Sequence, residues 1–305
     1  MAEMLDWNVA VYCANEAARL QGCLDSILTA LVGRRALVTI ILNGSSDGST
    51  DIACAAVRAG KPVEVFQIAA TDKSNAINQF YHVLRSPARA YAGVDGYVFV
   101  GADSFTAMER RLAMDPHALA VTGIATTGRT MRLATAATLA EGGRLHGQLH
   151  ALRPTFLDRM VARSIRLPVG LYRGDGLLGS MAAHDLAPIA TPWDNARIPG
   201  VVEATYAIQV LSPFKPRDLQ RQFRRKVRQM RGTIENAAIK SIIYQAGYEG
   251  LPGNADDMIL EHLARHGAPR VSVADRLFQR MAIRQATYVA RPDLEALMPH
   301  LVERA

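Results

Sequence analysis

The stretch Gly96-Tyr97-Val98-Phe99-Val100-Gly101-Ala102-Asp103-Ser104 decides the fold that we expect for this chain. Its apolar residues have high β-propensity and are bounded by glycine, which predicts a strand buried on both faces of a parallel sheet. Ligands of open α/β sheets bind beyond the carboxyl ends of the strands. Asp103 follows this strand, so its carboxylate is a candidate ligand for a divalent cation that holds phosphate oxygens. The alternative is that Asp103 only caps a following helix or turn.

Apolar strands and amphipathic helices alternate on the N-terminal side of this stretch. The elements expected there are strands at 8–13, 38–42 and 63–68 and helices at 17–31, 52–59 and 76–84. Short connections between alternating elements predict a mostly parallel central sheet, flanked by helices and built from right-handed crossovers.

The rest of the chain is less regular. We expect strand-like segments at 120–124 and 146–152, one long helix at 217–245 and a helical C-terminal tail. The resulting interpretation has three parts: a nucleotide-binding half at 1–110, an acceptor and catalytic half of the same domain at 111–215, and a basic helix with a helical extension at 216–305.

Composition limits the class of protein. The chain has 305 residues, of which 49% are hydrophobic and 21% are charged, as in an ordinary globular protein. Its net charge of +7 and isoelectric point of about 9.5 indicate an anionic partner. We expect no membrane span and no secretory signal, because neither apolar pattern is present. Three cysteines without metal-ligand spacing favour a cytoplasmic protein. The alternative location is peripheral, on the inner face of the membrane.

Three polar loops follow the first three predicted strands, at 14–16, 43–51 and 70–75. They should converge at one edge of the sheet, where small residues allow close approach to a nucleotide. The loop at 43–51 is not a Walker loop, because no Gly-Lys-Ser/Thr follows its glycines. The first turn is not a dinucleotide fingerprint either, because Gly-x-Gly-x-x-Gly is absent.

Four segments, in order, resemble the motifs of family 2 glycosyltransferases with the GT-A fold. Tyr12-Cys13-Ala14-Asn15-Glu16 is similar to their P-x-Y-N-E segment, and Asn43-Gly44-Ser45-Ser46-Asp47-Gly48-Ser49 to their D-D-G-S-x-D-G-T loop. Lys73-Ser74-Asn75-Ala76-Ile77-Asn78 resembles K-G-x-A-x-N, and Gly101-Ala102-Asp103 stands where the family carries its D-x-D metal motif. The order and spacing fit over residues 8–104.

The resemblance implies roles for particular residues. The implied nucleotide contacts are Ala14, Asn15, Glu16, Asn43, Ser45, Asp47, Lys73, Asn78 and Ala102. Asp103 would bind the Mg²⁺ or Mn²⁺ ion that bridges the diphosphate. Asp175, in a segment similar to the family's G-E-D motif, would be the catalytic base that takes the proton of an acceptor hydroxyl. The alternative for Asp175 is a turn residue between two glycines.

The sequence departs from the family pattern at three acids. Gly101 replaces the first aspartate of the metal motif, Leu42-Asn43 replaces the paired aspartates of the nucleotide loop, and Gly174 replaces the glutamate before the base. These departures leave a divergent donor, weak metal dependence and lost activity all open.

A basic helix is predicted where the chain carries much of its positive charge. Arg225 and Arg228 are the candidates for contact with the diphosphate or with anionic lipid, the latter suiting a lipid-linked acceptor. The alternative is a solvated charged face. Nucleic acid is not an expected partner, because the sequence lacks a recognised nucleic-acid module.

The function that the resemblance implies is transfer of a sugar from a UDP- or GDP-linked donor to a hydroxyl acceptor, lipid-linked or part of a cell-envelope glycan, with inversion. Two alternatives stay open. The first is a degenerate domain that binds a nucleotide or a partner without turnover. The second is a sugar nucleotidyltransferase, which would need a glycine-rich basic loop after the first strand.

Overall fold

A mixed β-sheet forms the centre of the computed structural model, which describes residues 4–209 and 216–304, with side chains omitted for 216–222. In the described residues the strand order is β5-β8-β6-β7-β4-β1-β2-β3-β9. The strands are β1 (Leu5–Cys13), β2 (Ala36–Asn43), β3 (Val63–Ile68), β4 (Ala88–Asp95), β5 (Val98–Val100), β6 (Ala120–Ala125), β7 (Leu149–Leu152), β8 (Gly200–Ile208) and β9 (His300–Arg304).

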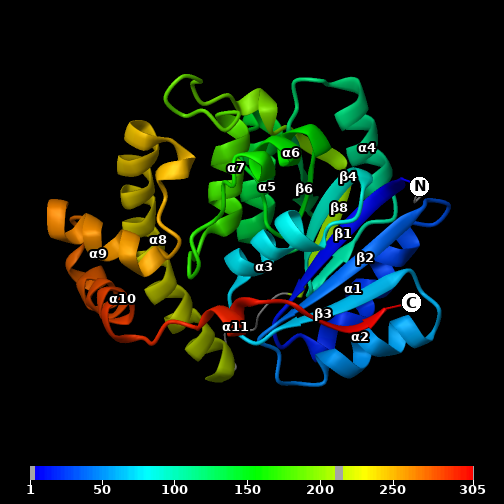
Figure 1. Cartoon of the computed structure of the whole chain (residues 1–305), viewed down its shortest axis with the longest axis horizontal. Helices are drawn as coiled ribbons and strands as arrows, with labels where there is room; N and C mark the ends of the chain where they lie inside the picture. The colour runs from blue at the N-terminus through cyan, green and yellow to red at the C-terminus, as the bar shows by residue number, and fades with distance from the viewer. Residues whose placement is uncertain (1–3, 210–215, 305) are drawn as a thin grey trace.

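Helices cover both faces of this sheet (Figure 1). They are α1 (Ala17–Ala30), α2 (Ser49–Arg58), α3 (Lys73–Gln79), α4 (Ser104–Met114), α5 (Arg129–Glu141), α6 (Pro154–Ala162), α7 (Gly174–Ala183), α8 (Pro216–Ala246), α9 (Ala255–His266), α10 (Arg276–Tyr288) and α11 (Leu294–Leu297). Helices α1, α2 and α4 pack on one face, and α3, α6, α7 and part of α8 pack on the other. Within the described residues, no helix is both long and apolar enough to span a bilayer.

Alternation along the strands explains why both faces are buried. In β1, the side chains of Trp7, Val9 and Val11 enter the core under α1, and those of Ala10 and Tyr12 enter the core under α3. Strands β1, β2, β3 and β4 are parallel neighbours. The prediction of a central sheet flanked by helices, with a helical C-terminal region, is confirmed. Six of the nine described strands run in one direction, whereas β5, β7 and β9 run antiparallel to their neighbours.

The C-terminal segment returns to the sheet after three helices. Figure 1 shows α8, α9 and α10 grouped to one side, and the red segment running back past α11 to the sheet. Strand β9 pairs antiparallel with β3 at the edge, and Arg304 forms an ion pair of 2.8 Å with Glu64 of β3. The predicted helical tail therefore ends in a strand that the sequence interpretation missed.

The prediction that the stretch at 96–104 forms a buried strand of the parallel sheet is wrong. The central strand is β4, which precedes that stretch and pairs parallel with β1. The chain then reverses, and β5 is a short strand that pairs antiparallel with β8 at the sheet edge, with Phe99 partly exposed. Strand β4 contains small residues, which have low β-propensity, so the sequence did not indicate a strand there. One of them is Gly93, where an added Cβ would lie 2.5 Å from the ring of His150.

Candidate active site

Several loops meet at the carboxyl edge of the parallel strands. Strands β1, β2 and β4 end there at Cys13, Asn43 and Asp95, and α3 begins beyond the end of β3. Parallel strands of an open sheet bind ligands at this edge. The polar side chains that face it are therefore the candidates for a functional site.

Asp95 forms the centre of a charged group at this edge. One of its carboxylate oxygens lies 2.5 Å from Nζ of Lys73, and the other accepts a hydrogen bond of 2.8 Å from the Tyr97 hydroxyl. Asp95 is buried, while the Lys73 side chain keeps 37% of its surface exposed. The site thus presents an ammonium group held against a buried carboxylate.

Asp175 joins this group from the other half of the sheet. It lies in the first turn of α7, and its Oδ2 accepts a hydrogen bond of 3.1 Å from the backbone N–H of Gly147. A Cβ added to Gly147 would lie 2.8 Å from Oδ2 of Asp175 and 2.9 Å from Nζ of Lys73. Gly147 therefore allows the carboxylate and the ammonium to approach the same backbone segment.

The charge states around these groups follow from burial and from neighbouring charges. Burial opposes the ammonium form of Lys73, but the carboxylates of Asp95 and Asp175 outweigh it and raise the pKa. Burial lowers the pKa of His146 and, helped by Lys73, lowers that of His150 to about 4. At neutral pH the site thus combines two neutral imidazoles with one permanent cation.

The loops after β1 and β2 are tied to each other. Oδ1 of Asn15 accepts from the backbone N–H of Ser46 at 2.9 Å, and the Ser45 hydroxyl accepts from the N–H of Asn15 at 3.2 Å. Asp47 accepts from the N–H of Ala17 at 3.0 Å and from that of Ser49 at 3.0 Å. Ser45 and Asp47 thus shape the loops that contain Ala14 and Glu16.

Two expected nucleotide contacts are buried and bonded to the backbone. Oδ1 of Asn43 accepts from the N–H of Asp72 at 2.8 Å. The amide of Asn78 donates to the carbonyl of Leu167 at 2.8 Å and accepts from its N–H at 2.9 Å. Asn78 therefore braces the segment before α7, which leaves its amide little capacity to meet a ligand.

The structure does not bring Asp103 and Ala102 to this group. Strand β5 runs antiparallel to β8, which is itself parallel to β6 and hence to β4. The chain therefore travels away from the carboxyl edge between Asp95 and Asp103. Asp103 stands at the N-cap position of α4, as in the capping alternative, although its side chain makes no capping hydrogen bond. The carboxylate at the expected edge is Asp95.

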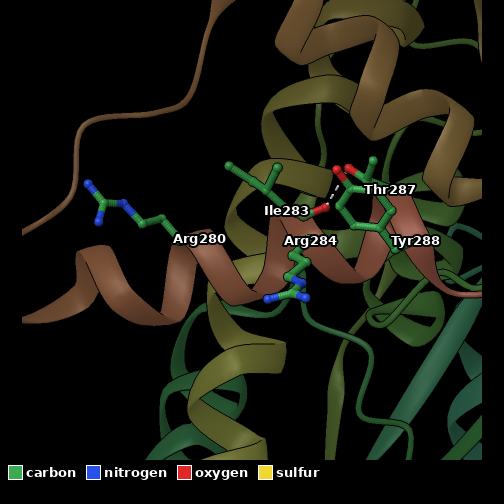
Figure 2. Close-up of a pocket in the computed structure, with 5 residues that line it drawn as sticks. All are labelled: Arg280, Ile283, Arg284, Thr287 and Tyr288. Atoms are coloured by element: carbon green, nitrogen blue, oxygen red, sulfur yellow. Dashed lines mark hydrogen bonds between the residues drawn. The ribbon is translucent and has the colours of Figure 1, made fainter.

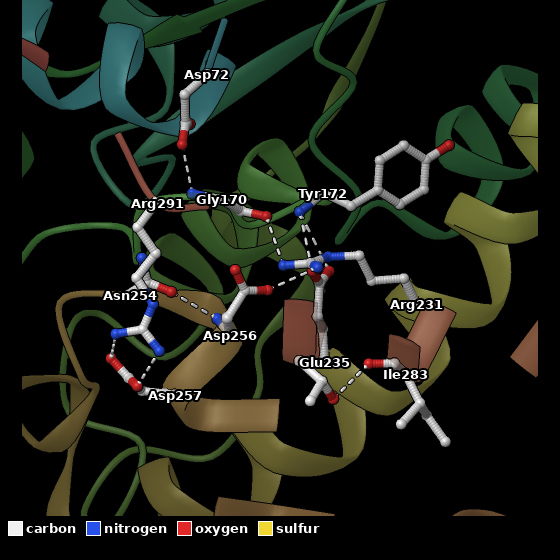
Figure 3. A network of polar contacts seen from close by, with 11 residues as sticks. Asp72, Gly170, Tyr172, Arg231, Glu235, Asn254, Asp256, Asp257, Ile283 and Arg291 are labelled. Carbon is white, nitrogen blue, oxygen red and sulfur yellow. Dashed lines mark hydrogen bonds and ion pairs between the residues drawn. The ribbon is translucent and has the colours of Figure 1, made fainter. Parts of the chain in front are cut away.

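The basic helix α8 reaches the site from the side. Arg225 and Arg228 are exposed, and the Arg228 guanidinium lies 5.5 Å from the ring centre of Tyr172, three residues before Asp175. Arg231, on the same helix, points inward instead. It forms ion pairs of 2.8 Å with Glu235 and 2.7 Å with Asp256, as Figure 3 shows.

This network connects α8 to both loops of the site. Arg231 donates to the carbonyl of Gly170 at 3.0 Å, and the carboxylate of Glu235 accepts from the N–H of Tyr172 at 3.2 Å. The N–H of Gly170 donates to Asp72, the N-cap of α3 (Figure 3). Arg231 thus contacts the segment before Asp175 directly and is linked to Asp72, the neighbour of Lys73, through Gly170.

Sequence reasoning missed Asp95, Tyr97, Gly147 and the pair of Arg231 with Glu235. One signal for Asp95 was present, because the segment Ala92-Gly93-Val94-Asp95 is an apolar run that ends in a carboxylate. No local pattern marked Gly147, whose role depends on contacts with residues far away in the chain.

One hollow on the described surface lies away from this group. A depression of about 510 Å³ lies on α10 and is lined by Arg280, Ile283, Arg284, Thr287 and Tyr288 (Figure 2). These residues belong to a single helix, and the depression contains none of the carboxyl-edge residues. We assign it no role in the chemistry of the site.

Comparison with known proteins gives similar structures only, since no protein-family description and no curated sequence matches the chain. The mannosyltransferase PcManGT from Pyrobaculum calidifontis, in complex with GDP-Man and Mn²⁺, is 17% identical, with a TM-score of 0.58 over 94% of this chain and 82% of that one. TarS from S. aureus in complex with UDP is 14% identical, with a TM-score of 0.54 over 93% of this chain and 81% of that one. The similarity shows a GT-A-like fold, which confirms the expected architecture.

Proposed function

We propose that this chain is a glycosyltransferase of family 2 that moves a sugar from a nucleoside-diphosphate sugar to a hydroxyl group. The observation that carries the proposal is the meeting of Asp175, Lys73 and Asp95 at the carboxyl edge of the sheet. Three motif-like segments in order, at 12–16, 43–49 and 73–78, support the family. Structures of the same fold that hold GDP-Man or UDP support a GDP- or UDP-linked donor.

In the proposed step, a carboxylate oxygen of Asp175 accepts the proton of the acceptor hydroxyl. The hydroxyl oxygen attacks the anomeric carbon, the bond from that carbon to the diphosphate breaks, and its electron pair stays on the diphosphate oxygen. Attack from the face opposite the leaving group inverts the anomeric centre. The N–H of Gly147 fixes the carboxylate of Asp175 at 3.1 Å, which orients the base.

We place the nucleotide beside the loops after β1 and β2, because they share the carboxyl edge with Lys73. We assign Ala14 and Glu16 of these loops to direct contact, although the carboxylate of Glu16 also forms an ion pair with Arg19. Asn15, Ser45 and Asp47 would act by shaping the loops, since their polar atoms already bond to one another and to the backbone.

The functional division of the chain belongs to the same proposal. Residues 1–110 would bind the donor, residues 111–215 would supply the acceptor side and the base, and residues 216–305 would support both. The boundary at 215 lies outside the described residues. The exposed Arg225 and Arg228 are the proposed contacts for a diphosphate or for the anionic membrane around a lipid-linked acceptor.

Mg²⁺ or Mn²⁺ is the cofactor that the family resemblance implies, and PcManGT was determined with Mn²⁺. The edge carboxylate of this chain, Asp95, is followed two residues later by Tyr97 instead of a second acid. The described residues contain no group of three histidine, cysteine, aspartate or glutamate side chains that could hold a metal ion. The donor set does not fit the expected metal site, and no step above passes through a metal.

A panel of nucleotides tests the donor site first. UDP, GDP, CMP, TDP and ADP are added with and without Mn²⁺, and the melting temperature is measured. A nucleotide at about 100 times its dissociation constant should add roughly 2.7 kcal/mol to the free energy of unfolding. If none of the nucleotides raises the melting temperature, the protein has no nucleotide-sugar site. If a nucleotide binds but no sugar is transferred from its nucleotide sugars, the degenerate domain is indicated.

Replacement of the base tests the reaction. With the donor known, Asp175→Asn should lower the transfer rate by about 10²- to 10⁴-fold and leave nucleotide binding intact. Asp158→Asn, which changes an exposed carboxylate on α6, serves as the matched control and should transfer at the wild-type rate. A fully active Asp175→Asn variant would remove Asp175 from the role of base.

A further inference from the structure

Both carboxylate oxygens of Asp95 have a partner inside the protein. Oδ1 lies 2.5 Å from Nζ of Lys73, and Oδ2 accepts the hydroxyl hydrogen of Tyr97 at 2.8 Å. A divalent cation at this place would have to displace the ammonium, and it would find a neutral phenol two residues later. Mg²⁺ and Mn²⁺ prefer several oxygen ligands with negative charge, so this arrangement favours the resident ammonium over a metal ion.

The Lys73 ammonium lies near both carboxylates of the site. Its ammonium contacts Asp95 directly, and the backbone of Gly147 lies against both the ammonium and Asp175. More than a third of the Lys73 side chain is exposed at the carboxyl edge, where a ligand would arrive. The ammonium has three donors, and Asp95 uses only part of that capacity.

We propose that the Lys73 ammonium binds the diphosphate of the donor and supplies the positive charge that a divalent cation supplies in metal-dependent transferases. This inference rests on the proposed function, because it assumes that a nucleoside diphosphate enters the site. Asp95 and Tyr97 then act as positioning residues that aim the ammonium at the carboxyl edge. Nucleotide binding by this chain therefore needs no added Mg²⁺ or Mn²⁺.

Calorimetric titration of the full chain with UDP and with GDP tests this role. Each titration is run once after treatment with EDTA and once with Mn²⁺ present. The expected result is the same dissociation constant in both buffers for whichever nucleotide binds. Binding that requires Mn²⁺ would overturn the role of Lys73 and leave the proposed function standing. Binding of neither nucleotide in either buffer would overturn both.

Variants of the lysine make the test specific. Lys73→Met should weaken nucleotide binding in EDTA about 10- to 100-fold, since a hydrogen bond to a charged group is lost. Lys61→Met removes an exposed ammonium between α2 and β3 and should bind as the wild type does. Lys73→Arg keeps the charge and should bind more tightly than Lys73→Met.

Folding and metal binding are followed in parallel. If Lys73→Met does not fold, the comparison of EDTA with Mn²⁺ on the wild type and on Lys73→Arg still decides the question. The electron paramagnetic resonance signal of free Mn²⁺ gives a readout that is independent of nucleotide affinity. The wild-type protein should leave that signal unchanged, and its loss on addition of protein alone would contradict the proposal.

Discussion

His150 shows how the site places a titratable side chain without using its charge. Its ring is buried, with Nδ1 lying 3.2 Å from the carbonyl oxygen of His146 and Nε2 lying 3.4 Å from the hydroxyl of Tyr81. Burial, followed by the charge of Lys73, lowers the pKa of His150 to about 4. The imidazole is thus a neutral packing and hydrogen-bonding group beneath the cluster of Lys73, Asp95 and Asp175.

This burial predicts a dependence of stability on pH. Between pH 6.5 and pH 4 the unfolded chain binds a proton at His150 that the folded chain does not, so stability falls as pH falls through that range. The loss between pH 7 and pH 5 should be about 2 kcal/mol for this residue. Urea unfolding of His150→Gln should show a smaller loss over that interval, whereas His300→Gln, at an exposed position, should match the wild type. An unchanged pH slope in His150→Gln would contradict the assignment.

Single residues of the site were predictable only where a motif marked them. Lys73 and Asp175 were found in this way, and the structure places them near one another. Asp103 was chosen because it follows the most apolar stretch, but β5 runs antiparallel to β8 and so leads that stretch away from the carboxyl edge. Asp95 follows a strand of small residues, and small residues give a weak strand signal in a single sequence.

At the scale of elements, the helix–strand alternation before residue 85 was predictable because its apolar periods are regular. Strands β1, β2 and β3 are confirmed, and the long helix α8 is confirmed from 216 to 246. Helix α7 was missed because it contains three glycines, which are weak helix formers, and its stability comes from packing on α3 and the core. Tertiary packing is not visible in local periodicity.

The link between helix α8 and the site depends on one arginine, Arg231. Glu235 is fully buried, burial raises the pKa of its carboxyl, and the charge of Arg231 opposes that rise. Arg231→Ala should cost about 3 to 5 kcal/mol in the free energy of unfolding, because it leaves a buried carboxylate without a counter-charge. Urea unfolding measures this loss, and Arg225→Ala on the exposed side of α8 should change stability by no more than about 0.5 kcal/mol.

A double variant measures the coupling between Arg231 and Glu235. Arg231→Ala with Glu235→Ala removes both charges, so it should be more stable than the sum of the two single changes predicts. Simple additivity of the two losses would show that the pair is not coupled. The melting curve and nucleotide affinity of each variant would then reveal whether the loops of Gly170 and Asp72 depend on the network.

For the whole molecule, the distribution of buried residues indicates unequal local stability. The two large cores lie on the two faces of the sheet, whereas α10 packs on a small cluster of Ile234, Ile259 and Ala286, with Leu263 and Ile283 at its border. Segments with few buried apolar contacts open with less free energy than core strands. Helix α10 should therefore open without the sheet.

Amide hydrogen exchange tests this difference directly. Amides of α10 should exchange faster than those of β1, β2 and β4, and should lose protection at lower urea concentration. Ile283→Ala should accelerate exchange in α10 and in the parts of α8 and α9 that share the small cluster, and should leave the sheet strands unchanged. Ile27→Ala, at a fully buried position between α1 and the sheet, should instead lower the protection of the sheet strands. Equal opening free energies for α10 and β1 would mean that strand β9, by fastening the end of the chain to β3, makes the C-terminal helices part of one cooperative unit with the sheet.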